Sequence, residues 1–112
     1  MSEEPKLVTS SECQQIELWP GVLRRTMCWG DRMLVAEITL AKGSEVPAHS
    51  HMHEQAGYIA RGRLEWTVDG KTKILSAGDG YAIPGNVTHS VRVLEDSVAI
   101  DIFSPVREEY KT

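Results

Sequence analysis

Alternation of apolar and polar residues is the feature of this chain that most restricts its fold. Residues 64–69 read Leu-Glu-Trp-Thr-Val-Asp, with an apolar side chain at every second position. Successive side chains of a β-strand point to opposite faces of a sheet, whereas an amphipathic helix needs apolar residues three and four positions apart. The segment is therefore predicted to be a strand with one face in the core and one face in solvent.

Short turns containing glycine and aspartate separate the alternating segments. Asp69-Gly70 is typical of a two-residue hairpin turn, and Gly30-Asp31 and Gly78–Gly80 mark further turns. The other predicted strands cover residues 22–29, 33–40, 71–75, 81–84, 88–94 and 97–103. About eight or nine strands between residues 15 and 104 indicate an all-β jelly-roll or barrel-like sandwich.

The whole chain reads as one domain, with a loosely held N-terminal extension over residues 1–14 and the barrel over residues 15–112. A chain of 112 residues is long enough for one core. A helix is expected nowhere except after Pro105. Arg61 and Arg63 flank Gly62 in a predicted turn.

Charge and composition exclude several classes of partner. Twelve Lys and Arg residues against sixteen Asp and Glu give a net charge of −4 without a dense basic stripe, which argues against a nucleic-acid partner. No window approaches the roughly eighteen apolar residues of a membrane span. The acidic segment 1–6 is unlike a signal peptide, and Cys13 and Cys28 fit two reduced thiols. We expect a cytoplasmic protein that binds neither nucleic acid nor membrane.

Three of the four histidines, His49, His51 and His53, fall within five residues, and the fourth is His89. If the chain is extended here, the side chains of His49 and His51 project from the same face. Imidazole binds divalent transition metals, and a pair needs further donors, which Gln55 and His89 could supply. A tract of surface histidines is the alternative that the cluster by itself leaves open.

The last predicted strand carries an acidic residue on one of its two faces. Val98, Ile100 and Ile102 share a face that we interpret as ordinary core packing, while Asp101 shares the other face with Ala99 and Phe103. A buried carboxylate is costly unless a cation or a catalytic role compensates for it. Asp101 is therefore either exposed on an edge strand or a candidate acid/base in an interior cavity.

The spacing Gly43-x5-His49-x-His51-x3-Gln55-x6-Gly62, followed by Gly78-x5-Pro84-x4-His89, closely resembles the two signature motifs of the cupin family. The resemblance covers nearly the whole chain. It implies a double-stranded β-helix barrel with a metal bound by His49, His51 and His89, and by Gln55 where cupins usually have glutamate.

The chain departs from the usual cupin pattern at several positions. A neutral Gln55 gives the site one negative charge fewer than the usual set, which favours polarisation of a substrate over redox cycling. Asn86 replaces a common glycine, and asparagine also adopts left-handed backbone conformations. A register that used His53 in place of His49 would break the glycine spacing, so His53 is expected at the rim of the site.

A narrower resemblance involves His49-x-His51-x2-Glu54-Gln55, Val93-Leu94-Glu95 and the stretch Asp101-Ile102-Phe103-Ser104-Pro105-Val106-Arg107-Glu108. These segments are similar to the KdgF type of small cupins, which act in pectin and alginate breakdown and linearise 4,5-unsaturated monouronates to 4-deoxy-5-keto-uronates. The resemblance implies that Gln55, Asp101, Phe103 and Arg107 contribute to catalysis or substrate binding. It also implies a homodimer.

The expected function is thus a non-redox ring opening of a small sugar acid that depends on a divalent metal such as Zn, Ni, Mn, Fe or Co. Asp101 would move the proton, and Arg107 would hold the substrate carboxylate, a role for which Arg61 could compete. Two other functions fit the same three histidines. One is a small cupin dioxygenase with Fe or Mn, and the other is a sugar-binding cupin without catalytic activity.

Overall fold

The computed structural model describes residues 4–112, and the described chain is built almost entirely of β-strands. Its elements are η1 (Ser10–Glu12), β1 (Gln15–Trp19), β2 (Val22–Trp29), β3 (Leu34–Leu40), β4 (Glu45–His49), β5 (Glu54–Val68), β6 (Lys71–Ser76), β7 (Gly80–Ile83), β8 (His89–Ser104) and η2 (Glu108–Tyr110). The predicted all-β class is confirmed. The first three residues of the predicted N-terminal extension lie outside the described residues. Within residues 4–112, no helix has the length and apolar character needed to cross a membrane.

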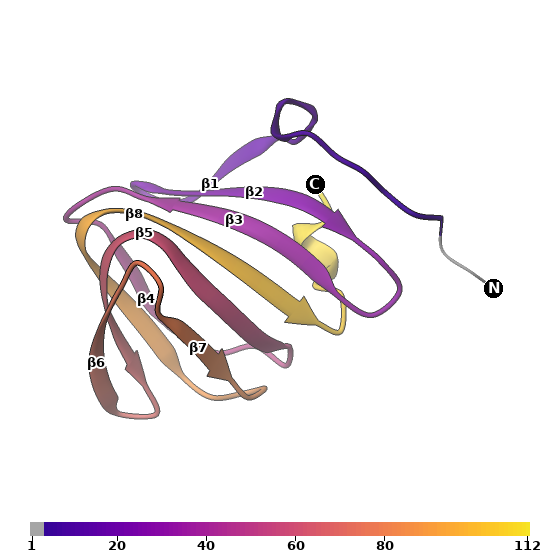
Figure 1. The fold of residues 1–112 in the computed structure, drawn as a ribbon. Coiled ribbons are helices and arrows are strands. Elements are labelled where there is room, and N and C mark those ends of the chain that lie inside the picture. Colours follow the sequence, from indigo (N-terminus) through magenta and orange to yellow (C-terminus); the bar gives the residue numbers. More distant parts are fainter. Residues whose placement is uncertain (1–3) are drawn as a thin grey trace.

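The two long strands β5 and β8 form the centre of the fold and pair antiparallel along most of their length. The N-terminal half of β8 also pairs with β4, and its C-terminal half pairs with β3, which leads on to β2 and β1. In the same way, β5 pairs first with β7 and then with β6. Both long strands therefore run through two layers of strands, and they curve from one layer into the other (Figure 1). The layers enclose a barrel whose interior holds the core.

The curvature of β5 is centred on Gly62, where the sequence predicted a turn. The β5–β8 pairing shifts register between Ile59 and Leu64, and Gly62 has a φ of +98°. A Cβ atom on Gly62 would lie 2.1 Å from the Ser97 Oγ and 2.5 Å from the Asp96 carbonyl oxygen. The predicted turn is therefore a bulge within one continuous strand. Because β8 bends with β5, the two strands predicted at 88–94 and 97–103 are also a single strand.

In the C-terminal half of β8, the face that carries Asp101 lies inside the barrel, and the aliphatic face does not. Ala99, Asp101 and Phe103 are buried, whereas Ile102 is 41% exposed. The prediction that the face with Val98, Ile100 and Ile102 packs in the core is therefore wrong. Only one face of a barrel strand lines the interior, and the register of β8 with β3 and β5 assigns that face to Asp101.

Candidate active site

Three imidazole rings meet at one end of the barrel although they come from separate segments of the chain. His49 is the last residue of β4, His89 is the first residue of β8, and the two are direct cross-strand partners. His51 follows β4 in the loop that leads to β5. One ring nitrogen from each of these three residues lies within 4.8 Å of the other two. β4 ends before His51. Of the two histidines that the sequence placed on one extended segment, only His49 therefore lies in the strand.

The hydrogen bonds of these rings leave one nitrogen of each available as a donor to a metal. The Nδ1 atoms contact backbone carbonyl oxygens of Pro47, His53 and Val87 at 2.8, 3.0 and 2.9 Å, for His49, His51 and His89 respectively. In a neutral imidazole, an Nδ1–H that donates to a carbonyl places the lone pair on Nε2. The three Nε2 atoms could thus serve as donors to a metal.

Burial supports the same protonation state for these rings. It lowers the pKa of His89 to about 4 and also lowers the pKa of His51, and Arg107 contributes to both shifts. The Nε2 atom of His89 is buried without a hydrogen-bond partner among the described residues. Such an unsatisfied acceptor is costly in a folded protein unless it binds a ligand. The arrangement fits a divalent transition metal.

The side chain of Gln55, the second residue of β5, connects the histidines to Asp101. Its Oε1 atom lies 3.1 Å from the Nε2 of His51, and its side chain also hydrogen-bonds Asp101. A carboxylate only accepts hydrogen bonds, so the Gln55 amide nitrogen donates to Asp101 and Oε1 faces the histidines. The lone pairs of Gln55 Oε1 and His51 Nε2 therefore face each other. This contact is unfavourable by itself and becomes favourable when both atoms bind one cation.

Asp101 is a buried carboxyl group on β8, with two hydrogen-bond donors. The Tyr81 hydroxyl donates to its Oδ1, and Gln55 is the other donor. Burial raises the pKa of Asp101 to about 6, although both hydrogen bonds and the positive charge of Arg107 act in the opposite direction. Burial and the neighbouring Asp101 also raise the pKa of Tyr81. At neutral pH, Tyr81 is therefore a hydrogen-bond donor to Asp101.

Arg107 and Phe103 lie beside the histidine cluster. The Phe103 ring is 2% exposed and meets the His51 ring edge to face, with 5.7 Å between centroids. The Arg107 guanidinium lies 5.2 Å from the Phe103 ring centroid and 4.0 Å from that of Tyr110 in η2. The Arg24 guanidinium, on β2, lies 4.4 Å from the same Tyr110 ring. The C-terminal segment thus holds Arg107 at the barrel end through aromatic contacts.

A cavity at this end of the barrel joins these groups. His49, Gln55, His89, Asp101, Phe103 and Arg107 all line it, together with Tyr81, Tyr110 and mostly apolar residues of the barrel interior. Among residues 4–112, Asp101 supplies the only carboxylate that lines this cavity. The cavity therefore presents metal donors, one acid and one cation to a small molecule.

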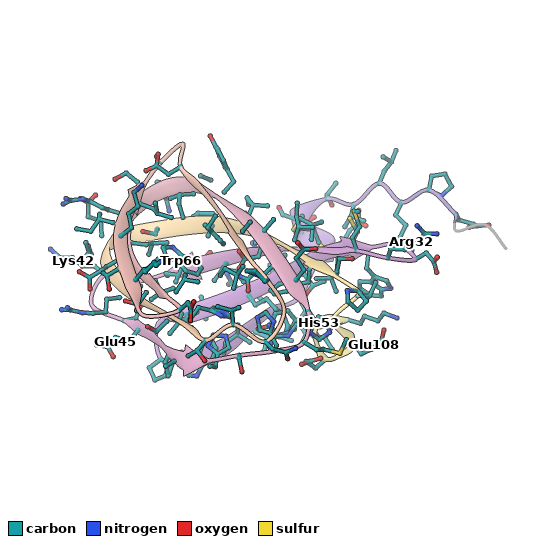
Figure 2. The ribbon with its side chains drawn as sticks, turned by 90° about the horizontal axis from the view of Figure 1, so that it is seen from below. Arg32, Lys42, Glu45, His53, Trp66 and Glu108 are labelled. Atoms are coloured by element: carbon teal, nitrogen blue, oxygen red, sulfur yellow. The ribbon has the colours of Figure 1, made fainter. Side chains whose placement is uncertain are left out.

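One histidine and one arginine that the sequence placed near the site have different surroundings from the residues of the cavity. His53, expected at the rim, is buried, with its Nδ1 atom lacking a partner in the described chain, and it lies at the same end of the barrel as the C-terminal segment (Figure 2). Arg61 is exposed and lines a groove with Glu17 and Asp96 on the outer surface. Among the described residues, Arg61 is not one of those that line the cavity with Arg107.

Sequence reasoning missed Tyr81, Arg24 and Tyr110. Tyr81 shares a face of β7 with the buried Ile83, and Arg24 shares a face of β2 with the buried Val22 and Thr26. The two-residue period could therefore have placed both side chains inside. No local pattern marks Tyr110, because only the return of the chain after β8 brings it to the cavity.

Comparisons with known proteins agree with this architecture. Residues 36–103 match the family model described as the cupin domain. The chain is 38% identical over 96 residues to the pectin degradation protein KdgF of Dickeya dadantii, covering 84% of this chain and 87% of that protein.

Two solved structures also superpose closely on this chain. KdgF from Halomonas sp. has a TM-score of 0.89 at 28% identity, covering 95% of this chain and 98% of the other. An RmlC-like cupin from Shewanella frigidimarina has the same TM-score and identity, covering 98% and 99%. With three imidazoles at the barrel end and these matches over most of its length, the chain belongs to the cupin family and, within it, to the KdgF group.

Proposed function

We propose that this protein opens the ring of 4,5-unsaturated monouronates and releases 4-deoxy-5-keto-uronates, in the breakdown of pectin or alginate. The observation that carries the proposal is the convergence of three imidazoles, the buried Asp101 and the Arg107 guanidinium on one cavity, in a chain of the KdgF group. The histidines, the Asp101 carboxyl group and the Arg107 guanidinium each have a role in this reaction.

The reaction is an isomerisation that needs no oxidant. The anomeric hydroxyl loses its proton, its electron pair forms the C1 carbonyl, and the bond between C1 and the ring oxygen breaks. The ring oxygen becomes an enolate oxygen on C5. A proton is then delivered to C4, which leaves a ketone at C5. The enzyme must therefore remove one proton, deliver one proton and stabilise a negative charge.

His49, His51, His89 and Gln55 would hold the divalent metal, and Zn, Ni, Mn, Fe and Co all suit this donor set. When bound, such an ion supplies a Lewis acid for negative charge on a substrate oxygen. The chain's own part is to keep the three imidazoles neutral, through burial and through the Nδ1 contacts with carbonyl oxygens.

Asp101 moves the proton, because within the described part of the chain it is the only carboxylate lining the cavity, and because Gln55 connects it to the histidine cluster. Burial raises its pKa to about 6, so both its protonated and its charged forms are accessible near neutral pH. Phe103 forms an apolar wall beside His51 and Arg107, on which a sugar ring can pack.

Arg107 binds the substrate carboxylate, since its guanidinium lines the cavity and can form two parallel hydrogen bonds with a carboxylate. We expect Arg107→Met, which keeps the apolar contacts with Phe103 and Tyr110, to raise KM by about 10- to 100-fold, the loss of one charge-assisted pair. The exposed Arg61→Met is the matched control and should leave KM unchanged in steady-state kinetics. Equal effects of the two substitutions would contradict the assignment.

The proposed activity is tested by mixing the protein with an unsaturated monouronate and following the ultraviolet band of its conjugated enol ether. The band should disappear with the metal-loaded protein and persist after a chelator has removed the metal, and NMR should identify the 5-keto product. Oxygen uptake with a phenolic or diketone substrate, without uronate turnover, would instead indicate a dioxygenase. A uronate that binds and stays intact would indicate a binding protein.

The proposal includes a homodimer. Ile102 on β8 and Met33 beside β3 are 41% and 58% exposed and line one groove on the outer face of the sheet, together with Trp29. Burial of this apolar face in a second copy supports pairing through the sheets. Light scattering of Ile102→Lys should then give the monomer mass.

A further inference from the structure

Tyr81, Gly57 and Asp101 lie in one row across three neighbouring strands. Gly57 on β5 is the direct cross-strand partner of Tyr81 on β7 and, on its other side, of Asp101 on β8. Cross-strand partners in a sheet place their side chains on the same face. Tyr81 and Asp101 thus project to the same side of the sheet and are separated by one intervening strand, a span of about 10 Å between their backbones.

Gly57 leaves the space over β5 that the Tyr81 ring occupies. A Cβ atom on Gly57 would lie 2.1 Å from the Cζ and 2.2 Å from the hydroxyl oxygen of Tyr81. Any other residue at position 57 would therefore displace the hydroxyl end of Tyr81. The φ of Gly57 is not in the left-handed region, so its backbone accepts an alanine and the tyrosine ring is the group that must move.

The Tyr81 ring also packs on Trp66, with ring centroids 4.1 Å apart and an interplanar angle of 34°. Trp66 is buried inside the barrel, and its ring also stacks on that of His89, with 6.4 Å between centroids. The Tyr81 ring thus packs against an indole and a bare strand. Its hydroxyl crosses β5 and donates to the Oδ1 of Asp101.

We propose that Tyr81 is a positioning residue for the ring-opening reaction, whose hydroxyl fixes the Asp101 carboxyl group for proton transfer across the opening left by Gly57. This inference rests on the proposed function. With Oδ1 engaged by Tyr81, the substrate proton is exchanged at Oδ2. Tyr81 keeps its own proton, consistent with the direction of its pKa shift, and acts on the substrate only through Asp101.

Steady-state kinetics of four variants test the inference. Tyr81→Phe keeps the packing on Trp66 and removes only the hydroxyl, so kcat should fall about 10- to 100-fold, the loss of one hydrogen bond to a charged group, while KM and the bound metal stay unchanged. Gly57→Ala should give a similar loss. The double variant should lose no more than either single variant, because both remove the same contact. Tyr58→Phe, on the exposed face of β5, is the control and should match the wild type.

A proton NMR spectrum of the substrate-free protein gives a readout that does not require activity. The buried Tyr81 hydroxyl should give a downfield, slowly exchanging resonance that is absent from Tyr81→Phe, shifted in Gly57→Ala and retained in Tyr58→Phe. A wild-type kcat for Tyr81→Phe, a change confined to KM, or additive losses in the double variant would overturn the inference. If the wild type leaves the uronate unchanged, the proposed function fails, and the resonance still decides whether Tyr81 holds Asp101. If Gly57→Ala does not fold, Tyr81→Phe decides alone.

Discussion

Asp101→Asn lowers kcat about 10²- to 10⁴-fold while the protein keeps its metal and its fold, because the substitution removes the proton-transferring group without changing the shape of the side chain. Asparagine can still accept the hydrogen bond from the Tyr81 hydroxyl. The measurement is the rate of loss of the enol-ether absorbance, together with metal content by elemental analysis. Asp31→Asn, whose side chain is 82% exposed, is the control and should retain wild-type kcat.

A stability measurement separates a catalytic role for Asp101 from a structural one. Burial raises the pKa of Asp101 from 3.8 to about 6, so the folded metal-free protein binds a proton more tightly than the unfolded chain. The carboxylate therefore destabilises the fold increasingly as the pH rises from about 4 to about 6, and the full cost, roughly 3 kcal/mol, is present at pH 7.5. Asp101→Asn should raise the free energy of unfolding at that pH. A variant that is less stable and has lost its metal would contradict the assigned role.

His89→Ala has the second large expected effect, which is loss of the metal. His89 supplies a buried nitrogen that has no other partner in the described part of the chain, and its removal leaves at most two imidazoles. Structural and catalytic zinc sites have at least three protein ligands drawn from Cys, His and Asp/Glu, and the neutral Gln55 amide that would remain beside His49 and His51 is a weaker donor than an imidazole. We expect the bound metal to fall from about one equivalent to less than roughly a tenth after gel filtration, with a matching loss of uronate turnover.

The matched control for His89→Ala is His53→Ala. His53 is also a buried histidine near the barrel end, but it lies outside the group of three converging nitrogens. The metal content of His53→Ala should equal that of the wild type. If His53→Ala lost the metal, the His51/His53 register would be correct and the assigned donor set would be wrong.

Several features of the fold follow from local sequence because they depend on a few neighbouring residues. The Asp69-Gly70 turn has φ values of +51° and +79°, and Asn86 has a φ of +67°, in agreement with the predicted left-handed conformations. The period of two identified the strands of the barrel. The spacing of glycines and histidines identified the cupin motifs because it fixes where turns and donors recur along the chain.

Other features could not be obtained in this way. The predicted turn at Gly62 is a bulge because its backbone lies against Ser97, a residue 35 positions further along the chain. Likewise, alternation shows that Ala99, Asp101 and Phe103 share a face, but the pattern is the same whether that face is inside or outside. Its placement depends on the register of β8 with β3 and β5.

The amino-acid sequence alone determined the strand content, the turns and the types of residue available for a metal and for proton transfer, since these depend on short-range periodicity and on side-chain chemistry. Only the tertiary structure decided which groups meet. The pairing of His49 with His89, the reach of Tyr81 over Gly57 to Asp101 and the return of Tyr110 to Arg107 all join residues that are distant in sequence. Such contacts arise from strand register and chain closure, which no local pattern encodes.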